Sequence, residues 1–235
     1  LIIELSMILI DGKKVAADIR SELKDKTSQL KAEGKNVPGL VAIIVGEDPA
    51  SQIYVASKGK ACEEIGMRTK TEKLSADISE AELLSLIQSY NQNKDYHGIL
   101  VQLPLPKHIN EDKVIETISH KKDVDGFHPI SVGNLVIGKD TFASCTPAGI
   151  QELLIRYKIE TKGKHVVVVG RSNIVGKPIA NIMLQKAEGA NSIVTIVHSA
   201  AKDISYYSKQ ADILIAAIGK AEMIKADMVK DGVAV

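Results

Sequence analysis

Two apolar segments separated by a glycine-containing turn and a helical pattern constrain the fold of this chain most strongly. The first segment is HVVVV at 165–169, and the second is SIVTIV at 192–197. Unbroken runs of β-branched residues are typical of strands buried on both faces, and a helix between two such strands requires parallel pairing with a right-handed crossover. The segment therefore predicts a βαβ unit whose turn at Gly170 lies at the carboxyl end of the first strand.

The same alternation continues on both sides of this unit. Thr146 is expected to cap a helix with Pro147 at its first position. The expected elements after the βαβ unit are a helix near 204–209, the strand DILIAAIG at 212–219, a short helix near 226–230 and a strand beginning at 232. We expect a domain boundary at Thr146, which divides the chain into 7–145 and 146–235, and the chain appears C-terminally truncated inside its last strand.

Strands and helices also alternate in the first half. Apolar runs at 40–45 and 98–103 predict buried strands, and a more polar strand is expected at 67–74. The expected helices cover 12–34, 51–66, a segment opened by a capping box at Ser79 to Glu82, and 111–119. This order predicts an α/β fold with a second, open parallel sheet in the N-terminal domain.

Charge and composition narrow the class of partner. The 235 residues include 30 Lys and Arg against 29 Asp and Glu, and 45% are hydrophobic. A balanced charge without blocks provides no field that would attract nucleic acid or an anionic membrane. We therefore expect a globular protein that acts on a small molecule, without a nucleic-acid or membrane partner.

Cysteine usage and the N-terminal run bear on location. Cys62 and Cys145 lie in no metal-binding or CxxC spacing, which fits a reducing cytoplasm, and both are predicted to be ordinary thiols. The run LIIELSMILI is too short to cross a bilayer and is interrupted by Glu4. We expect a cytoplasmic protein whose natural start is Met7.

The helix expected at 51–66 carries two polar side chains on one face. Tyr54 and Lys58 are four residues apart and therefore stack, while Ser51 is expected to cap the helix. Ile53 is assigned with three other residues to its apolar stripe. Spacing alone favours the simpler interpretation, in which Lys58 is one more solvated lysine and Tyr54 only packs, so evidence for chemistry must come from the rest of the chain.

The turn GRSNIVGKP at 170–178 differs from the six-position GxGxxG fingerprint. Gly170 and Gly176 are nevertheless expected to let the backbone approach a phosphate at a helix N-terminus. The next strand ends in His198 and Ser199, where NAD-binding proteins usually carry an acid. With Arg171 nearby, this favours a ribose 2′-phosphate and hence NADP, although Arg171 could be an ordinary surface residue.

Three further polar residues are candidates for the same crevice. Gln102 lies near the carboxyl end of its predicted strand, where ligands bind in open α/β sheets. Asp125 offers a carboxylate on the loop at 123–129, whereas Asp123 is expected to bond its own backbone. The six histidines occur singly, so we assign none of them to catalysis and expect no metal.

Five motifs together resemble one enzyme family. They are the Tyr54/Lys58 pair, VQLPLP at 101–106, KDVDGFHP at 122–129, CTPAG at 145–149 and GRSNIVGKP at 170–178. In this order they are similar to the bifunctional methylenetetrahydrofolate dehydrogenase/methenyltetrahydrofolate cyclohydrolase family, from about Ile10 to the end. The family implies an N-terminal catalytic domain, a Rossmann-like NADP-binding domain and a cleft between them.

The resemblance also implies an activity and a set of site residues. Methylenetetrahydrofolate would be oxidised with NADP, and the methenyl product hydrolysed to 10-formyltetrahydrofolate. Lys58 resembles the catalytic lysine, Gln102 the glutamine that positions it, Tyr54 the ring that stacks on the folate and Asp125 the carboxylate that holds the pterin. The cofactor phosphate positions match Arg171, Ser172 and Ser199.

Some alternatives and one departure remain open at this stage. The family continues beyond residue 235 with a glycine-rich segment and a helix that this chain lacks. A homodimer through the cofactor domain is what the resemblance suggests. A non-catalytic nucleotide sensor or a shikimate-type or amino-acid dehydrogenase would also need the Gly170 turn, although neither would need all five motifs.

Overall fold

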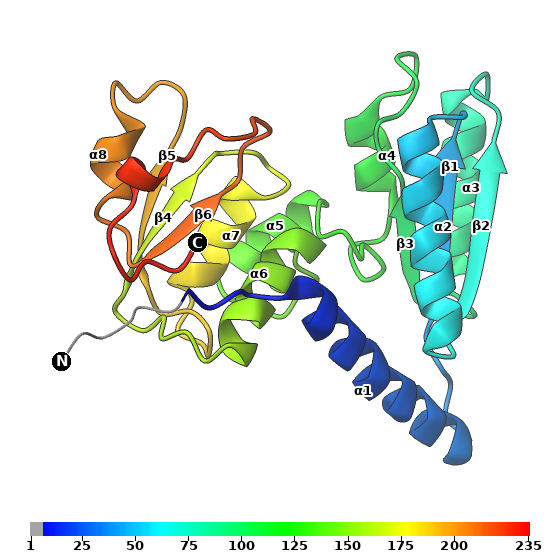
Figure 1. The fold of residues 1–235 in the computed structure, drawn as a ribbon. Helices are drawn as coiled ribbons and strands as arrows, with labels where there is room; N and C mark the ends of the chain where they lie inside the picture. The colour runs from blue at the N-terminus through cyan, green and yellow to red at the C-terminus, as the bar shows by residue number, and fades with distance from the viewer. Residues whose placement is uncertain (1–6) are drawn as a thin grey trace.

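The computed structural model describes residues 7–235 as two α/β units, each built on a small parallel sheet (Figure 1). Part of the N-terminal run at 1–10 lies outside the described residues. Within the described chain, no helix is long and apolar enough to cross a membrane. Both sheets contain three parallel strands, which confirms the α/β class.

The first sheet has the order β2-β1-β3, with β1 at Gly39–Val45, β2 at Arg68–Leu74 and β3 at Gly98–Val101. Its helices are α2 at Pro49–Glu64, α3 at Glu80–Gln92 and α4 at Glu111–Thr117. Val41 and Ile43 face the core formed with α3 and α4, while Ala42 and Ile44 face Val55 of α2. Alternate residues of β1 thus fill the two cores, because successive side chains of a strand point to opposite faces.

The second sheet has the order β5-β4-β6, with β4 at His165–Val169, β5 at Ile193–Val197 and β6 at Ile213–Ala216. Its helices are α6 at Cys145–Arg156, α7 at Gly176–Leu184, α8 at Ile204–Ser208 and the 3-10 helix η1 at Ala226–Met228. The four valines of β4 are fully buried. The predicted βαβ unit is confirmed, since β4 and β5 pair in parallel on either side of α7.

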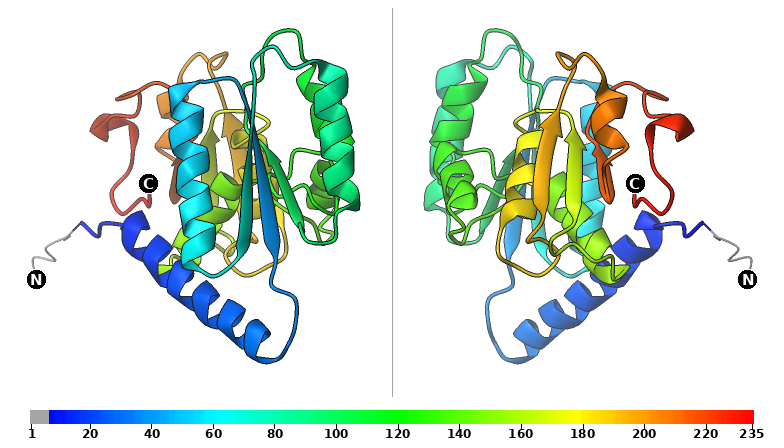
Figure 2. Two further views of the ribbon diagram at one scale, coloured as in Figure 1. Left: turned by 90° about the vertical axis from the view of Figure 1, so that its right-hand side faces the viewer. Right: turned by 90° about the vertical axis from the view of Figure 1, so that its left-hand side faces the viewer.

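Two helices lie between or beneath these units. Helix α5, Pro129–Val136, was not predicted from the sequence. It packs against α7, and Gln185 Nε2 donates a hydrogen bond to the Leu135 carbonyl of α5 at 2.9 Å. Helix α1, Gly12–Ala32, runs along the lower edge of the molecule and reaches both α2 and α6 (Figures 1 and 2). The domain division between residues 145 and 146 stays a prediction.

The structure corrects several helix boundaries. Helix α2 is capped by Asp48 rather than Ser51: Asp48 Oδ2 accepts the Ser51 N–H at 2.8 Å. Ile53 does not belong to the apolar stripe, because it is 73% exposed. The capping box at Ser79 is confirmed.

The start of α6 and the ends of two strands also differ from expectation. The N-cap of α6 is Ser144, not Thr146, and Pro147 is its third residue. The Ser144 side chain makes no capping hydrogen bond. Pro147, the third residue of the helix, has no N–H that it could accept. Strand β3 ends at Val101, and the expected last strand forms only one bridge, between Ala234 and Ile213.

Candidate functional site

Tyr54 and Lys58 stack on α2, as their four-residue spacing predicted. The Lys58 ammonium lies 4.3 Å from the centre of the Tyr54 ring, within the range of a cation–π contact. Tyr54 is 53% exposed, so its ring is available to a flat ligand, while Lys58 is half-buried. The Lys58 ammonium is thus held over a ring face and partly shielded from solvent.

Asp123 and Asp125 have different roles although they are two residues apart. Asp123 is buried, and its Oδ2 accepts hydrogen bonds from the His128 N–H (2.9 Å) and the Ser131 hydroxyl (2.8 Å). These bonds fix the loop, as expected for a structural aspartate. Asp125 receives no hydrogen bond from the rest of the described chain and is therefore free to bind a ligand.

The electrostatics of Asp125 connect it to α2. Burial raises the pKa of the Asp125 carboxyl above its ordinary value, the Lys58 ammonium opposes this rise, and the Asp123 carboxylate adds to it. A cation acts on a carboxyl pKa in this way only at short range. Lys58 and Asp125, 67 positions apart in the sequence, therefore belong to one site.

Cys145 is a member of this site that sequence reasoning missed. Its side chain reaches solvent, and Sγ lies 3.8 Å from the Val124 carbonyl oxygen. Burial and the Asp125 carboxylate raise the pKa of the Cys145 thiol, while the Lys58 ammonium lowers it. The available signal was its place in CTPAG, one of the five motifs, at the start of α6.

Gln102 follows β3 directly. Its backbone N–H donates to the Ile43 carbonyl at 2.8 Å and so continues the pairing of β3 with β1. The side-chain Nε2 donates to the Leu103 carbonyl (2.8 Å), whereas the buried Oε1 accepts no hydrogen bond within the described residues. Oε1 is thus available to accept a hydrogen bond from an ammonium group or from a substrate N–H. The positioning of Lys58 by Gln102 stays a prediction.

The turn after β4 owes its glycines to close backbone packing. A Cβ at Gly170, where φ is +130°, would lie 2.2 Å from the Ala217 carbonyl oxygen, and one at Gly176 would lie 2.4 Å from the Gly170 oxygen. Close packing of the backbone in this turn therefore leaves no room for a side chain at either glycine, and their contact with a cofactor phosphate stays a prediction. Ser172 Oγ accepts the amides of Val175 (3.1 Å) and Gly176 (3.3 Å), and so holds the turn against α7.

The residues expected to contact the cofactor phosphate lie at the carboxyl ends of two paired strands. Gly170, at the end of β4, donates its N–H to the Val197 carbonyl of β5 at 2.8 Å, so the segments that follow run side by side. Arg171, Ser172 and Ser199 are all exposed, and Arg171 forms no ion pair with another described residue. A cation and two hydroxyls at this edge fit a phosphate-bearing dinucleotide.

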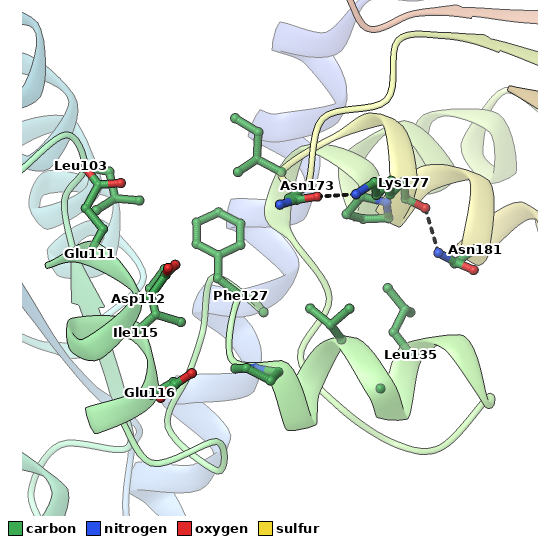
Figure 3. Close-up of a pocket in the computed structure, with 16 residues that line it drawn as sticks. Leu103, Glu111, Asp112, Ile115, Glu116, Phe127, Leu135, Asn173, Lys177 and Asn181 are labelled. Carbon is green, nitrogen blue, oxygen red and sulfur yellow. Dashed lines mark hydrogen bonds between the residues drawn. The ribbon is translucent and has the colours of Figure 1, made fainter. Parts of the chain in front are cut away.

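A cavity of about 640 Å³ lies between the two units (Figure 3). Asn173 and Lys177 line one side of it, and Glu111, Asp112 and Glu116 of α4 line the other, with Phe127 between them. The expected cleft between the halves is therefore present. No predicted site residue lines this cavity, although Gly126, the neighbour of Asp125, does.

Among residues 7–235, no group of three His, Cys, Asp or Glu side chains is placed to hold a metal. The site instead combines a dinucleotide-type turn in one unit with an amine, an aromatic ring and a carboxyl in the other. This arrangement defines a class, the two-domain enzymes that bring a nicotinamide cofactor to a ring-containing substrate across an interdomain cleft.

Comparison with known proteins gives the particular family. The model for "Tetrahydrofolate dehydrogenase/cyclohydrolase, catalytic domain" matches residues 10–125, and that for the NAD(P)-binding domain of the same proteins matches 144–235. The chain therefore belongs to the tetrahydrofolate dehydrogenase/cyclohydrolase family. It oxidises methylenetetrahydrofolate with a nicotinamide dinucleotide and hydrolyses the methenyl product to 10-formyltetrahydrofolate.

Individual relatives agree with the family models. Bifunctional protein FolD of Chloroherpeton thalassium is 58% identical over 97% of this chain and 79% of its own length, and that of Chlorobium limicola is 60% identical over 97% and 78%. The crystal structure of the bifunctional FolD enzyme from Campylobacter jejuni has a TM-score of 0.92 at 47% identity, covering 97% of this chain and 79% of that one. The Trypanosoma brucei FolD enzyme, complexed with NADP cofactor and inhibitor, has a TM-score of 0.88 at 34% identity, covering 95% and 75%. These matches exclude the nucleotide sensor and the shikimate-type or amino-acid dehydrogenase.

Proposed function

We propose that Lys58 is the acid–base group of the hydrolysis step, with the substrate ring stacked on Tyr54 and the pterin held by Asp125. The observation that carries this assignment is the position of the Lys58 ammonium, 4.3 Å from the Tyr54 ring and within electrostatic reach of Asp125. Hydrolysis of a methenyl cation requires a water molecule activated beside a positive charge. An amine at this position can orient that water molecule and take up its proton.

Hydride transfer makes a different demand on the protein. The nicotinamide and the folate must lie face to face at contact distance, so the two units supply position rather than an acid or base. Lys58 and Gln102 then contribute to this step mainly through alignment of the substrate. We propose that the free Gln102 Oε1 accepts a hydrogen bond from the Lys58 ammonium when folate is bound.

We further propose that the cofactor is NADP rather than NAD. The 2′-phosphate would contact the Arg171 guanidinium and the hydroxyls of Ser172 and Ser199. No carboxylate occupies the end of β5, where His198 and Ser199 follow Val197, so nothing there repels a phosphate. The Trypanosoma brucei relative named above was crystallised with NADP, which agrees with this choice.

We propose a homodimer through β5, which forms the edge of its sheet. Ile193 is 64% exposed and Ile196 43% exposed on this strand, and Tyr206 and Tyr207 of α8 extend the apolar surface. An exposed edge strand with apolar side chains is a template for pairing with another chain. We also propose a cytoplasmic location, in keeping with two free thiols.

Spectrophotometric turnover tests the assignment directly. Purified protein is supplied with methylenetetrahydrofolate and either NADP or NAD, and formation and decay of the methenyl absorbance are followed. Faster formation with NADP, followed by decay above the uncatalysed rate, is the expected result. Equal rates with both cofactors would refute the NADP assignment, and an uncatalysed decay rate would refute the hydrolytic site.

A further inference from the structure

Helix α1 is bonded to the cofactor unit by its N-terminal half. The guanidinium of Arg156, at the end of α6, makes two parallel bonds to Glu22, from Nη1 to Oε1 and from Nη2 to Oε2, each 2.8 Å long. Eleven residues earlier in the chain, at the N-cap of α1, the Asp11 N–H donates to the Tyr157 hydroxyl at 2.7 Å. These contacts join residues more than 130 positions apart and fix α1 on the C-terminal end of α6.

The same helix is also bonded to the other unit, through residues on both sides of Glu22. Thr27, a buried residue, donates its hydroxyl to the Ile65 carbonyl at the end of α2. Arg20 Nε lies 3.4 Å from Glu64 Oε2, on the last turn of α2. Helix α1 therefore braces α6 against α2, and Figure 2 shows it crossing beneath both units.

The two helices joined in this way carry opposite sides of the candidate site. Lys58 and Tyr54 project from α2, whereas Cys145 opens α6 beside Asp125. Lys58 lies six residues, or about 9 Å, from the braced end of α2. A small rotation at the brace therefore changes the separation between Lys58 on α2 and Cys145 on α6.

Arg156 is suited to hold this angle. Its Nε is bonded to Glu152 on the same helix at 2.6 Å, which orients the planar guanidinium before it meets Glu22. Only a quarter of the Arg156 side chain is exposed (26%). A bidentate pair fixes direction as well as distance, which a lysine cannot reproduce.

We propose that Arg156 is a positioning residue: through Glu22 and α1 it sets the separation between α2, which carries Lys58, and the N-terminal end of α6, where Cys145 borders the folate site. The proposal rests on the site residues assigned under the proposed function. Arg156 itself touches neither substrate nor cofactor. Cofactor binding is confined to the β4–α7 and β5 edge and is independent of the brace.

The test compares folate kinetics with cofactor binding in three single variants and one double. Arg156→Lys and Glu22→Gln should each raise KM for methylenetetrahydrofolate by about five- to tenfold and lower kcat, because the bidentate pair is lost in both. The double variant should be no worse than either single variant. NADP affinity, measured by fluorescence titration, should stay within about twofold of the parent.

Glu152→Gln is the matched control, because it removes a charge next to Arg156 but keeps a side-chain oxygen that can accept the Nε–H, and it leaves the pair with Glu22. Its folate KM should remain near the parent value. Parent-like kinetics in both Arg156→Lys and Glu22→Gln would overturn the proposal. Equal loss of folate and NADP affinity with a lower Tm would also overturn it, since that pattern reports general destabilisation.

Failure of the catalytic assignment would appear in a different variant. If Lys58→Met hydrolyses the methenyl compound at the parent rate, the proposed function is wrong. A change in folate KM that is confined to Arg156 and Glu22 would still show that the brace controls the folate site.

Discussion

The central strands of the two sheets, β1 and β4, end in the same type of turn. Each is the middle strand of a three-stranded parallel sheet, and each is followed by a glycine of positive φ, Gly46 at +84° or Gly170 at +130°. Gly46 donates its N–H to the Leu74 carbonyl at the end of β2 (2.9 Å), as Gly170 does to Val197 at the end of β5. Both turns then lead into a helix at the carboxyl edge of the sheet.

The first turns of these helices differ in charge. At α2, the Asp48 carboxylate accepts the Ser51 amide and places an anion of the protein at the helix N-terminus. At α7, the N-cap is Val175, and the neutral hydroxyl of Ser172 meets the first amides. A helix N-terminus attracts anions, so of these two helices only α7 suits the proposed cofactor phosphate. The proposed anion site and the proposed reactive side chain, Lys58, thus follow the same topology in different halves.

The largest effect is expected from Lys58→Met, which tests whether α2 contributes chemistry. Methionine keeps much of the packing but cannot carry a proton, so cyclohydrolase activity should fall by about 10²–10⁴. Dehydrogenase activity should fall less, because it depends on ring alignment. Separate assays of the two steps give the measurement, with Lys60→Met, an exposed lysine on the same helix, as control.

Asp125→Asn should separate folate binding from stability. We expect folate affinity to fall by about tenfold or more, because a charge-assisted bond to the pterin is lost. Burial raises the pKa of Asp125 in the folded protein, so ionisation opposes folding at neutral pH, and the variant should melt at a higher temperature than the parent. This difference should shrink as pH falls through the raised pKa of the folded protein, and should vanish below the ordinary aspartate pKa. A lower Tm at neutral pH would contradict the prediction.

Arg171→Ala tests the anion site of the other half. NADP affinity should fall tenfold or more while NAD affinity changes little, because only NADP carries the 2′-phosphate. Titration of both cofactors gives the measurement, and Lys186→Ala in the same unit provides a control for a simple change in net charge. Equal losses for NADP and NAD would refute the assignment.

Asp48→Ala is expected to have the smallest effect and isolates the difference between the two turns. Loss of the cap should lower Tm by about 2–4 °C, with NADP affinity and kcat near the parent values. The hydrogen bonds from Ser51 hold the pKa of the Asp48 carboxyl below its ordinary value. The stabilisation by this cap is therefore fully present above the pKa that Asp48 has in the unfolded chain, and it is lost as pH falls through the pKa that Asp48 has in the folded protein. Asp48→Asn, which keeps the capping oxygen, should retain most of the stability at neutral pH. An unchanged melting curve in Asp48→Ala would show that α2 needs no cap.

Much of the fold could be predicted because its signals are local. The valines at 166–169 require a buried strand, and the capping box at Ser79 starts α3 where expected. Helix α5 was missed because PISVGNLV is short, contains Gly133 and is rich in β-branched residues. Its stability comes from packing on α7, which a local pattern does not record.

The sequence by itself determined the order of the elements, the two parallel sheets and the family, because strand runs, caps and the five motifs are properties of neighbouring residues. Only the tertiary structure decided that Cys145 joins Lys58 and Asp125, and that α1 braces α2 against α6. These arrangements depend on contacts between residues far apart in the chain. Their distances are set by how the two cores pack, and no single segment encodes that geometry.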